Sequence, residues 1–144
     1  MLTEDNVVLA VCRKLETEAY TIRQRLNTKQ RGEDIIALKG QVYLSIEAKG
    51  STSSKNNTQR YGYPFSTKQI QSHVARAFYK ACIILFSPST HRLEGELKAG
   101  IALPDTEHHR QAVRAIKPII MELQIVIFWV KSIDDVEVES IWSL

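Results

Sequence analysis

The stretch GEDIIALKGQVYLSIEAKG, residues 32–50, decides the fold that this chain is expected to adopt. It contains two runs of β-forming residues, Asp34–Leu38 and Val42–Ala48, on either side of a turn at Gly40-Gln41. A two-residue turn that begins with glycine favours a type II′ hairpin. The stretch therefore predicts two antiparallel strands joined by a tight turn.

The register of this hairpin places two carboxylates opposite each other. The turn pairs Lys39 with Val42, and the same pairing continued outward ends with Asp34 opposite Glu47. Directly opposed residues lie about 4.5–5.5 Å apart at Cβ, where like charges are destabilising. Lys49 supplies one compensating cation on the same face, because side chains alternate along a strand. A divalent metal would supply a stronger one, so we interpret this end of the hairpin as a metal site. The alternative is a half-exposed hairpin whose charged ends lie in water.

The two faces of the predicted hairpin differ in polarity. The face expected to pack on the core carries Ile35, Ala37, Val42, Leu44, Ile46 and Ala48. The other face carries Asp34, Ile36, Leu38, Tyr43, Ser45, Glu47 and Lys49.

Length and composition indicate one soluble domain over residues 1–144, with 44% apolar and 24% charged residues. The longest apolar runs, Ala81–Phe86 and Ile125–Val130, are far shorter than the roughly 20 residues of a membrane span. No signal peptide is expected, because the first residues are acidic. Cys12 and Cys82 lack metal-ligand or redox spacing, so we expect free thiols and a cytoplasmic protein.

One long stretch of the chain carries positive charges and no negative ones. No Asp or Glu occurs between Ala48 and Leu93, although the net charge of the whole chain is only +3. Such a basic stretch is typical of phosphate-backbone binding, whereas the alternative is a solvated surface balanced in three dimensions. The polar stretch 50–66 also carries aromatic residues, which could stack on bases or simply anchor an insertion. The residues expected to bind nucleic acid are Lys55, Arg60, Lys68, His73, Arg76 and Lys80.

Periodicity assigns the remaining elements and predicts an α/β fold with a mixed sheet. Helices are expected over about 4–18, 67–80 and 105–123, the last divided at Pro118. Further strands are expected over Tyr20–Leu26, Ala81–Ser87, Ala99–Leu103, Ile125–Val130 and Val136–Trp142.

Asp34, followed by Glu47-Ala48-Lys49 within an α-β-β-β-α-β order over about residues 3–87, resembles the PD-(D/E)XK nuclease superfamily. The resemblance implies a restriction-endonuclease-like core, here with a C-terminal strand–helix–strand extension. It also implies an endonuclease that hydrolyses phosphodiester bonds in DNA with Mg²⁺ or Mn²⁺. The proline that names the motif is absent, because Glu33 precedes Asp34.

The resemblance assigns a role to each motif residue. Asp34 and Glu47 would be metal ligands, the carbonyl of Ala48 would fill a further position, and Lys49 would assist the attacking water. These residue types suit the chemistry, because Mg²⁺ takes oxygen ligands and needs only one or two carboxylates. A bound metal also lowers the pKa of its water.

Many members of the superfamily add a glutamine from the second helix and an acid from the first. Gln69 is preferred over Gln71 as the catalytic glutamine, because it shares a helix face with the basic residues. For the acid, Glu4, Asp5 and Glu16 stay open.

Other motifs point away from metal clusters and nucleotide cofactors. Glu107-His108-His109 is expected at the surface, and neither GxSxG nor GxxxxGK[ST] occurs. A homodimer is expected, because one active site cuts one strand of a duplex. The rival interpretations are a non-catalytic DNA-binding or assembly protein with a nuclease-like fold, and a structural module with an acidic protein partner.

Overall fold

The computed structural model describes residues 1–27, 30, 32–52, 62–86 and 95–144. Over these residues the chain forms four helices and six strands, and the strands make a single sheet in the order β1-β2-β3-β4-β5-β6. In chain order the elements are α1 (Glu4–Thr17), β1 (Thr21–Arg25), β2 (Ile35–Lys39), β3 (Val42–Ala48), α2 (Thr67–Phe86), β4 (Glu96–Pro104), α3 (Glu107–Arg114), α4 (Lys117–Glu122), β5 (Val126–Ser132) and β6 (Asp135–Glu139).

The sheet is mixed, as the sequence predicts. β3, β4 and β5 are parallel neighbours, whereas β1, β2 and β6 join the sheet through antiparallel pairs. The prediction of an α/β fold with a mixed sheet is therefore confirmed. Among the described residues, no helix has both the length and the apolar character needed to cross a bilayer.

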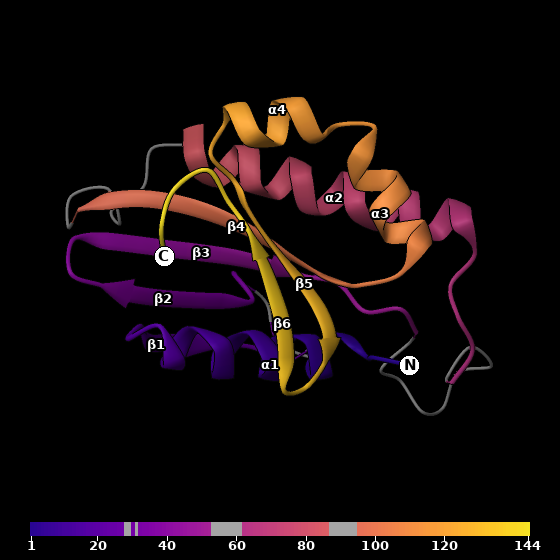
Figure 1. The fold of residues 1–144 in the computed structure, drawn as a ribbon, viewed down its shortest axis with the longest axis horizontal. Coiled ribbons are helices and arrows are strands. Elements are labelled where there is room, and N and C mark those ends of the chain that lie inside the picture. Colours follow the sequence, from indigo (N-terminus) through magenta and orange to yellow (C-terminus); the bar gives the residue numbers. More distant parts are fainter. Residues whose placement is uncertain (28–29, 31, 53–61, 87–94) are drawn as a thin grey trace.

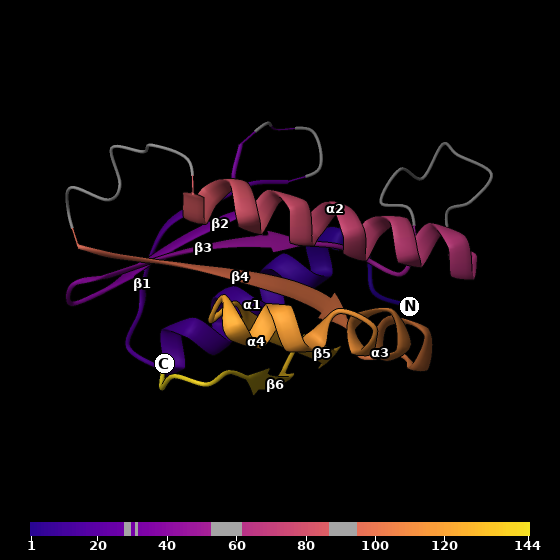
Figure 2. The same ribbon diagram turned by 90° about the horizontal axis from the view of Figure 1, so that it is seen from above.

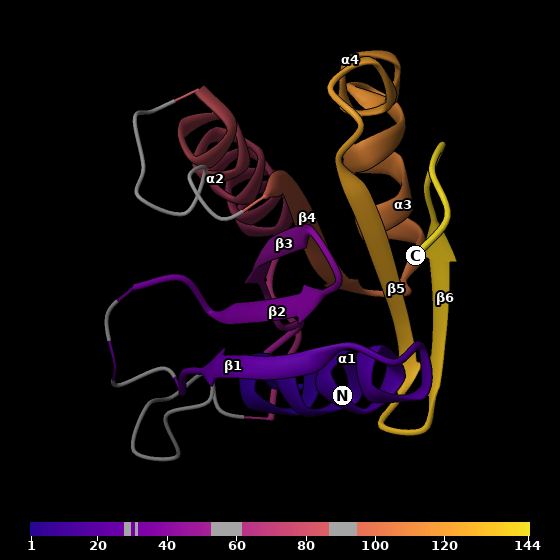
Figure 3. The ribbon, with the colours of Figure 1, turned by 90° about the vertical axis from the view of Figure 1, so that its left-hand side faces the viewer.

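Helices cover both faces of the sheet. α1 lies against one face, and α2, α3 and α4 lie against the other (Figures 1 and 2). Each interface has its own apolar core. One joins α1 to β2, β3 and β5, and the other joins α2, α3 and α4 to β4 and β5. An end-on view shows α1 and the α2–α4 side separated by the twisted sheet (Figure 3).

The hairpin has the predicted register. Lys39 pairs with Val42, and the pairing continues to Ile35 opposite Ile46. Of the two turn residues only Gly40 has a positive φ, 57°, which fits a glycine-led type II′ turn. Both faces of β3 are covered, so the alternative of a half-exposed hairpin does not hold for this strand.

The predicted strand over Ala81–Ser87 is wrong. Helix α2 continues without a break to Phe86, and Ser87 lies outside the described residues. An apolar run cannot distinguish a buried strand from the end of a buried helix. Here only one side of the run is covered, because Ala81 is buried while Ile83 and Phe86 are exposed.

The strand that follows α2 is β4, which contains the predicted strand over Ala99–Leu103. The order helix, three strands, helix, strand therefore covers α1 to β4 rather than residues 3–87. After β4 come two helices and two strands, so the predicted strand–helix–strand extension is also wrong. The division at Pro118 is confirmed, because α3 and α4 are separate helices.

Candidate functional site

Asp34, Ala48 and Lys49 meet where the hairpin strands end farthest from the turn. Asp34 directly precedes β2, and Oδ2 of its carboxylate accepts a 2.8 Å hydrogen bond from the backbone N–H of Ala48. Ala48 ends β3, and Lys49 follows it. The strand pairing itself ends at Ile35 opposite Ile46, and the Asp34 side chain contacts the backbone of Ala48 just beyond it.

Glu47 is a buried carboxylate with two cationic neighbours. Its side chain is 5% exposed, and its Oε1 lies 3.4 Å from Nζ of Lys49. The same oxygen lies 2.8 Å from Nζ of Lys80, which comes from α2. Removing a carboxylate from water is costly unless cations or donors replace the lost hydration. The two ammonium groups supply that replacement.

Asp34 is less well compensated than Glu47. Burial, followed by the nearby Glu47 carboxylate, raises the pKa of Asp34 to about 7. The Ala48 N–H and the Lys49 ammonium act in the opposite direction without cancelling the rise. Asp34 therefore exchanges its proton near neutral pH, and a cation beside it would favour the ionised form.

The first helix contributes one of its three candidate acids to this region. Burial is the main cause that raises the pKa of Glu4, and its next largest interactions are with Lys49 and Glu47. Asp5 and Glu16 are exposed. Glu4 is thus the acid whose charge interacts with the candidate site. Sequence reasoning could not select it, because the choice depends on how α1 packs against the end of β3.

The segment after β3 holds the start of α1 in place. The backbone N–H of Ser51 donates a 2.9 Å hydrogen bond to the carbonyl of Leu2. A Cβ added to Gly50 would lie 2.4 Å from the backbone nitrogen of Glu4, so only glycine allows this close approach. Gly50 directly follows the Glu-Ala-Lys motif, and this glycine was an available signal for the contact.

Gln69, the predicted catalytic glutamine, caps a helix. Its Oε1 accepts a 2.8 Å hydrogen bond from the N–H of Ser66, and the hydroxyl of Ser66 accepts one of 3.2 Å from the N–H of Gln69. Gln69 lies about 16 Å along the helix axis from Lys80, the α2 residue that contacts Glu47. Gln71 lines a groove between α2 and α3. A catalytic role for Gln69 would require its side chain to give up the hydrogen bond from Ser66.

The predicted nucleic-acid contacts that the structure describes all belong to α2. Lys68 and Arg76 are exposed, whereas Lys80 is half-exposed and already paired with Glu47. The His73 ring packs edge-on against Phe65 with ring centroids 4.6 Å apart. Burial is the main cause that lowers the pKa of His73, followed by Lys49 and Arg76.

The other two predicted contacts, Lys55 and Arg60, lie outside the described residues.

The expectation that Glu107-His108-His109 lies at the surface is wrong for His109. Its side chain is fully buried, and its Nδ1 lies 2.6 Å from the hydroxyl of Thr106. Burial lowers the pKa of His109 to about 4, so the ring is neutral near pH 7. Thr106 also caps α3, because its hydroxyl accepts a hydrogen bond from the N–H of His109.

A divalent cation at this site would have few protein ligands. Among the residues described, no three His, Cys, Asp or Glu side chains are grouped so that they could hold an ion. Asp34, Glu47 and the carbonyl of Ala48 are the groups that would hold one. This set fits Mg²⁺, which keeps several waters, and the raised pKa of Asp34 marks a charge that such an ion would stabilise.

No family model, curated protein or solved structure matches this chain.

Proposed function

We propose that this chain is a Mg²⁺- or Mn²⁺-dependent DNA endonuclease of the PD-(D/E)XK type with a restriction-endonuclease-like core. The observation that carries the proposal is the cluster at the end of the hairpin. Asp34 accepts a hydrogen bond from Ala48, and Glu47 pairs with Lys49. The order of elements from α1 to β4, α-β-β-β-α-β, supports the same proposal.

Each residue of the cluster has a distinct task in this proposal. Asp34, Glu47 and the Ala48 carbonyl would bind the metal, which supplies a water of lowered pKa and stabilises charge on the phosphate. Lys49 lies beside Glu47 and is 15% exposed, so its ammonium is held in a defined place. There it would orient the attacking water or hold a non-bridging phosphate oxygen.

The basic surface of α2 would bind the sugar–phosphate backbone. Lys68 and Arg76 are exposed on this helix, and the sequence has no acid between Ala48 and Leu93. Binding of this kind depends strongly on salt and little on sequence. A homodimer belongs to the proposal as well, because cutting a duplex requires two such sites.

Labelled DNA substrates incubated with Mg²⁺, Mn²⁺ or EDTA test the proposal. We expect the wild type to cleave with either metal and not with EDTA. Glu47→Gln should lower cleavage by about a hundredfold or more, because it removes a metal ligand. DNA binding in a filter assay without divalent metal should be retained.

Glu96→Gln is the matched control, because Glu96 also pairs with a lysine, Lys98 at 3.1 Å, but its side chain is 62% exposed. Its cleavage should equal that of the wild type. Cleavage that persists in EDTA or in Glu47→Gln would refute the proposal.

A second candidate is a non-catalytic DNA-binding or assembly protein. The observation that favours it is that Glu47 already has two lysine partners, which can replace a metal as counter-charge. This candidate predicts salt-sensitive DNA binding with neither Mn²⁺ binding nor cleavage. The same assays therefore separate the two candidates.

A further inference from the structure

Lys80 reaches the candidate site from outside the hairpin. It belongs to α2, which packs on the opposite face of the sheet from α1. Its Nζ lies 2.8 Å from Glu47 Oε1, closer than the 3.4 Å of Lys49 Nζ to the same oxygen. One oxygen of a proposed metal ligand therefore faces two ammonium groups.

The two lysines differ in their freedom to move away. The side chain of Lys49 is 15% exposed, whereas that of Lys80 is 52% exposed. A lysine side chain that is half in water can place its ammonium in solvent at little cost, because its flexible stem reaches the surface. A buried ammonium that loses its partner pays a desolvation penalty. Lys80 is thus the neighbour that can leave Glu47.

A divalent cation bound at Glu47 would compete with the Lys80 ammonium for the same carboxylate oxygen. An ion held by Asp34 and Glu47 needs an electron pair of Glu47, and its two positive charges repel ammonium groups only a few ångströms away. Both cannot approach one carboxylate closely.

We propose that Lys80 is a positioning residue that competes with the divalent cation: it holds Glu47 in the metal-free protein and is released to bind a DNA phosphate when the ion binds. The inference rests on the proposed function. It adds a coupling between the two ligands, since a phosphate that draws Lys80 away from Glu47 would tighten metal binding. By reciprocity the metal would tighten DNA binding to the same extent.

Calorimetric titration of the full chain with Mn²⁺, without DNA, tests this role. Lys80→Gln removes the competing charge and should tighten Mn²⁺ binding about tenfold at low salt, with a smaller gain at high salt. Lys14→Gln is the control. Lys14 also pairs with a glutamate, Glu18 at 3.3 Å, but near the C-terminal end of α1, whereas Glu4 of the candidate site begins that helix. This variant should bind Mn²⁺ within about twofold of the wild type, because charges beyond about 10 Å are screened.

DNA binding measured in Ca²⁺ provides a second readout. Lys80→Gln should weaken it, and adding Ca²⁺ should strengthen DNA binding less in this variant than in the wild type. A Lys80 variant acting only through altered folding would not tighten metal binding. Should Lys80→Gln not fold, Lys80→Met keeps the apolar stem and carries the same expectation.

The outcomes separate this inference from the proposed function. Unchanged or weaker Mn²⁺ binding in Lys80→Gln overturns the competition, even when the wild type binds Mn²⁺ and Glu47→Gln does not. If neither the wild type nor Lys80→Gln binds Mn²⁺, both the proposed function and the competition by Lys80 are overturned.

Discussion

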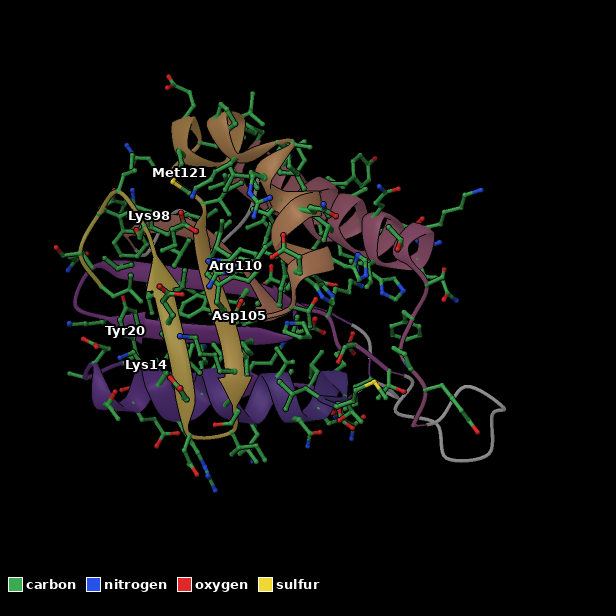
Figure 4. The ribbon with its side chains drawn as sticks, turned by 45° about the vertical axis from the view of Figure 1, so that its right-hand side comes forward. Lys14, Tyr20, Lys98, Asp105, Arg110 and Met121 are labelled. Atoms are coloured by element: carbon green, nitrogen blue, oxygen red, sulfur yellow. The ribbon has the colours of Figure 1, made fainter. Side chains whose placement is uncertain are left out.

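Two partly buried clusters of charged side chains in this protein shift the pKa of an aspartate in opposite directions. In the first, Asp105 receives two hydrogen bonds from Arg110, of 2.7 and 2.9 Å. Arg110 also donates a 2.6 Å bond to Glu137 and lies 4.1 Å over the ring of Trp129. Asp105 and Arg110 lie close together where α3 meets the sheet (Figure 4). The hydrogen bonds from Arg110 are the main cause that lowers the pKa of Asp105.

The second cluster is the candidate site, where the pKa of Asp34 is raised by burial and by Glu47. The guanidinium fork of Arg110 donates two hydrogen bonds to Asp105, whereas Asp34 has one backbone donor and a like charge beside it. Burial and charge alone therefore do not distinguish a functional site from a structural cluster. A carboxylate left uncompensated is the better candidate, because a ligand beside it could supply the missing charge.

The largest effect is expected from Lys49→Met. Loss of the ammonium beside Glu47 should lower metal-dependent cleavage by about a hundred- to ten-thousandfold, the usual range for a group that assists proton transfer. Initial rates on labelled DNA measure the loss. Arg110→Met, in the first cluster, should leave these rates unchanged. Equal losses in both variants would mean that the two clusters do not differ in function.

Asp34→Asn should make the protein more stable at alkaline pH. Because the pKa of Asp34 rises from 3.8 to about 7 on folding, the folded protein holds this proton more tightly than the unfolded chain. The resulting stability is present below about pH 4 and is lost as the pH rises toward 7. Asparagine does not ionise, so at pH 8 this variant should exceed the wild type by about 2–4 kcal/mol in the free energy of unfolding.

Asp105→Asn should change the free energy of unfolding in the opposite direction, because the pKa of Asp105 is lowered on folding. The stability from its ionised form is present at neutral pH and is lost as the pH falls through its folded pKa, so this variant should be less stable than the wild type at pH 8. Denaturant titrations from pH 4 to 8 measure both variants. Two variants with shifts of the same sign would contradict the contrast between the clusters.

Arg110→Met should lower the free energy of unfolding by about 2 kcal/mol, because it removes charge-assisted hydrogen bonds and the contact with Trp129. Lys80→Gln should lower the free energy of unfolding by less, since the side chain of Lys80 is half-exposed to water. Thermal and denaturant melts compare the two. A larger loss for Lys80→Gln would assign Lys80 a structural role instead.

Gly50→Ala should cost about 1–2 kcal/mol of stability, because the new Cβ must push the start of α1 away from the hairpin. Ser51→Ala, which removes only the 3.2 Å side-chain bond to Leu2, should cost less. The same displacement would move Glu4 and alter Mn²⁺ affinity, while the Asp105 cluster stays as it is. Denaturant melts and Mn²⁺ titrations check both effects.

The hairpin could be predicted from the sequence because its information is local. A glycine that adopts a positive φ at position 40 specifies the pairing, and alternation then assigns every side chain to a face. Pro118 divided its helix for a similarly local reason. The run over Ala81–Phe86 was misassigned, because its apolar residues suit a helix and a strand equally.

The composition of the site depended on packing between distant elements. Lys80 was predicted to bind nucleic acid, yet its contact with Glu47 follows from how α2 crosses the sheet. The choice of Glu4 over Asp5 and Glu16 follows from how α1 meets the segment after β3. Spacing along the chain contains neither of these relations.

Binding of Mn²⁺ to the wild type, Asp34→Asn and Glu47→Gln is the sharpest test of whether these two carboxylates share a metal ion. Calorimetry should find one tightly bound ion in the wild type, and binding should be weakened at least tenfold in each variant, because both carboxylates would share the ion. A wild type that binds no Mn²⁺, or variants that bind it as the wild type does, would mean that Asp34 and Glu47 do not form a metal site.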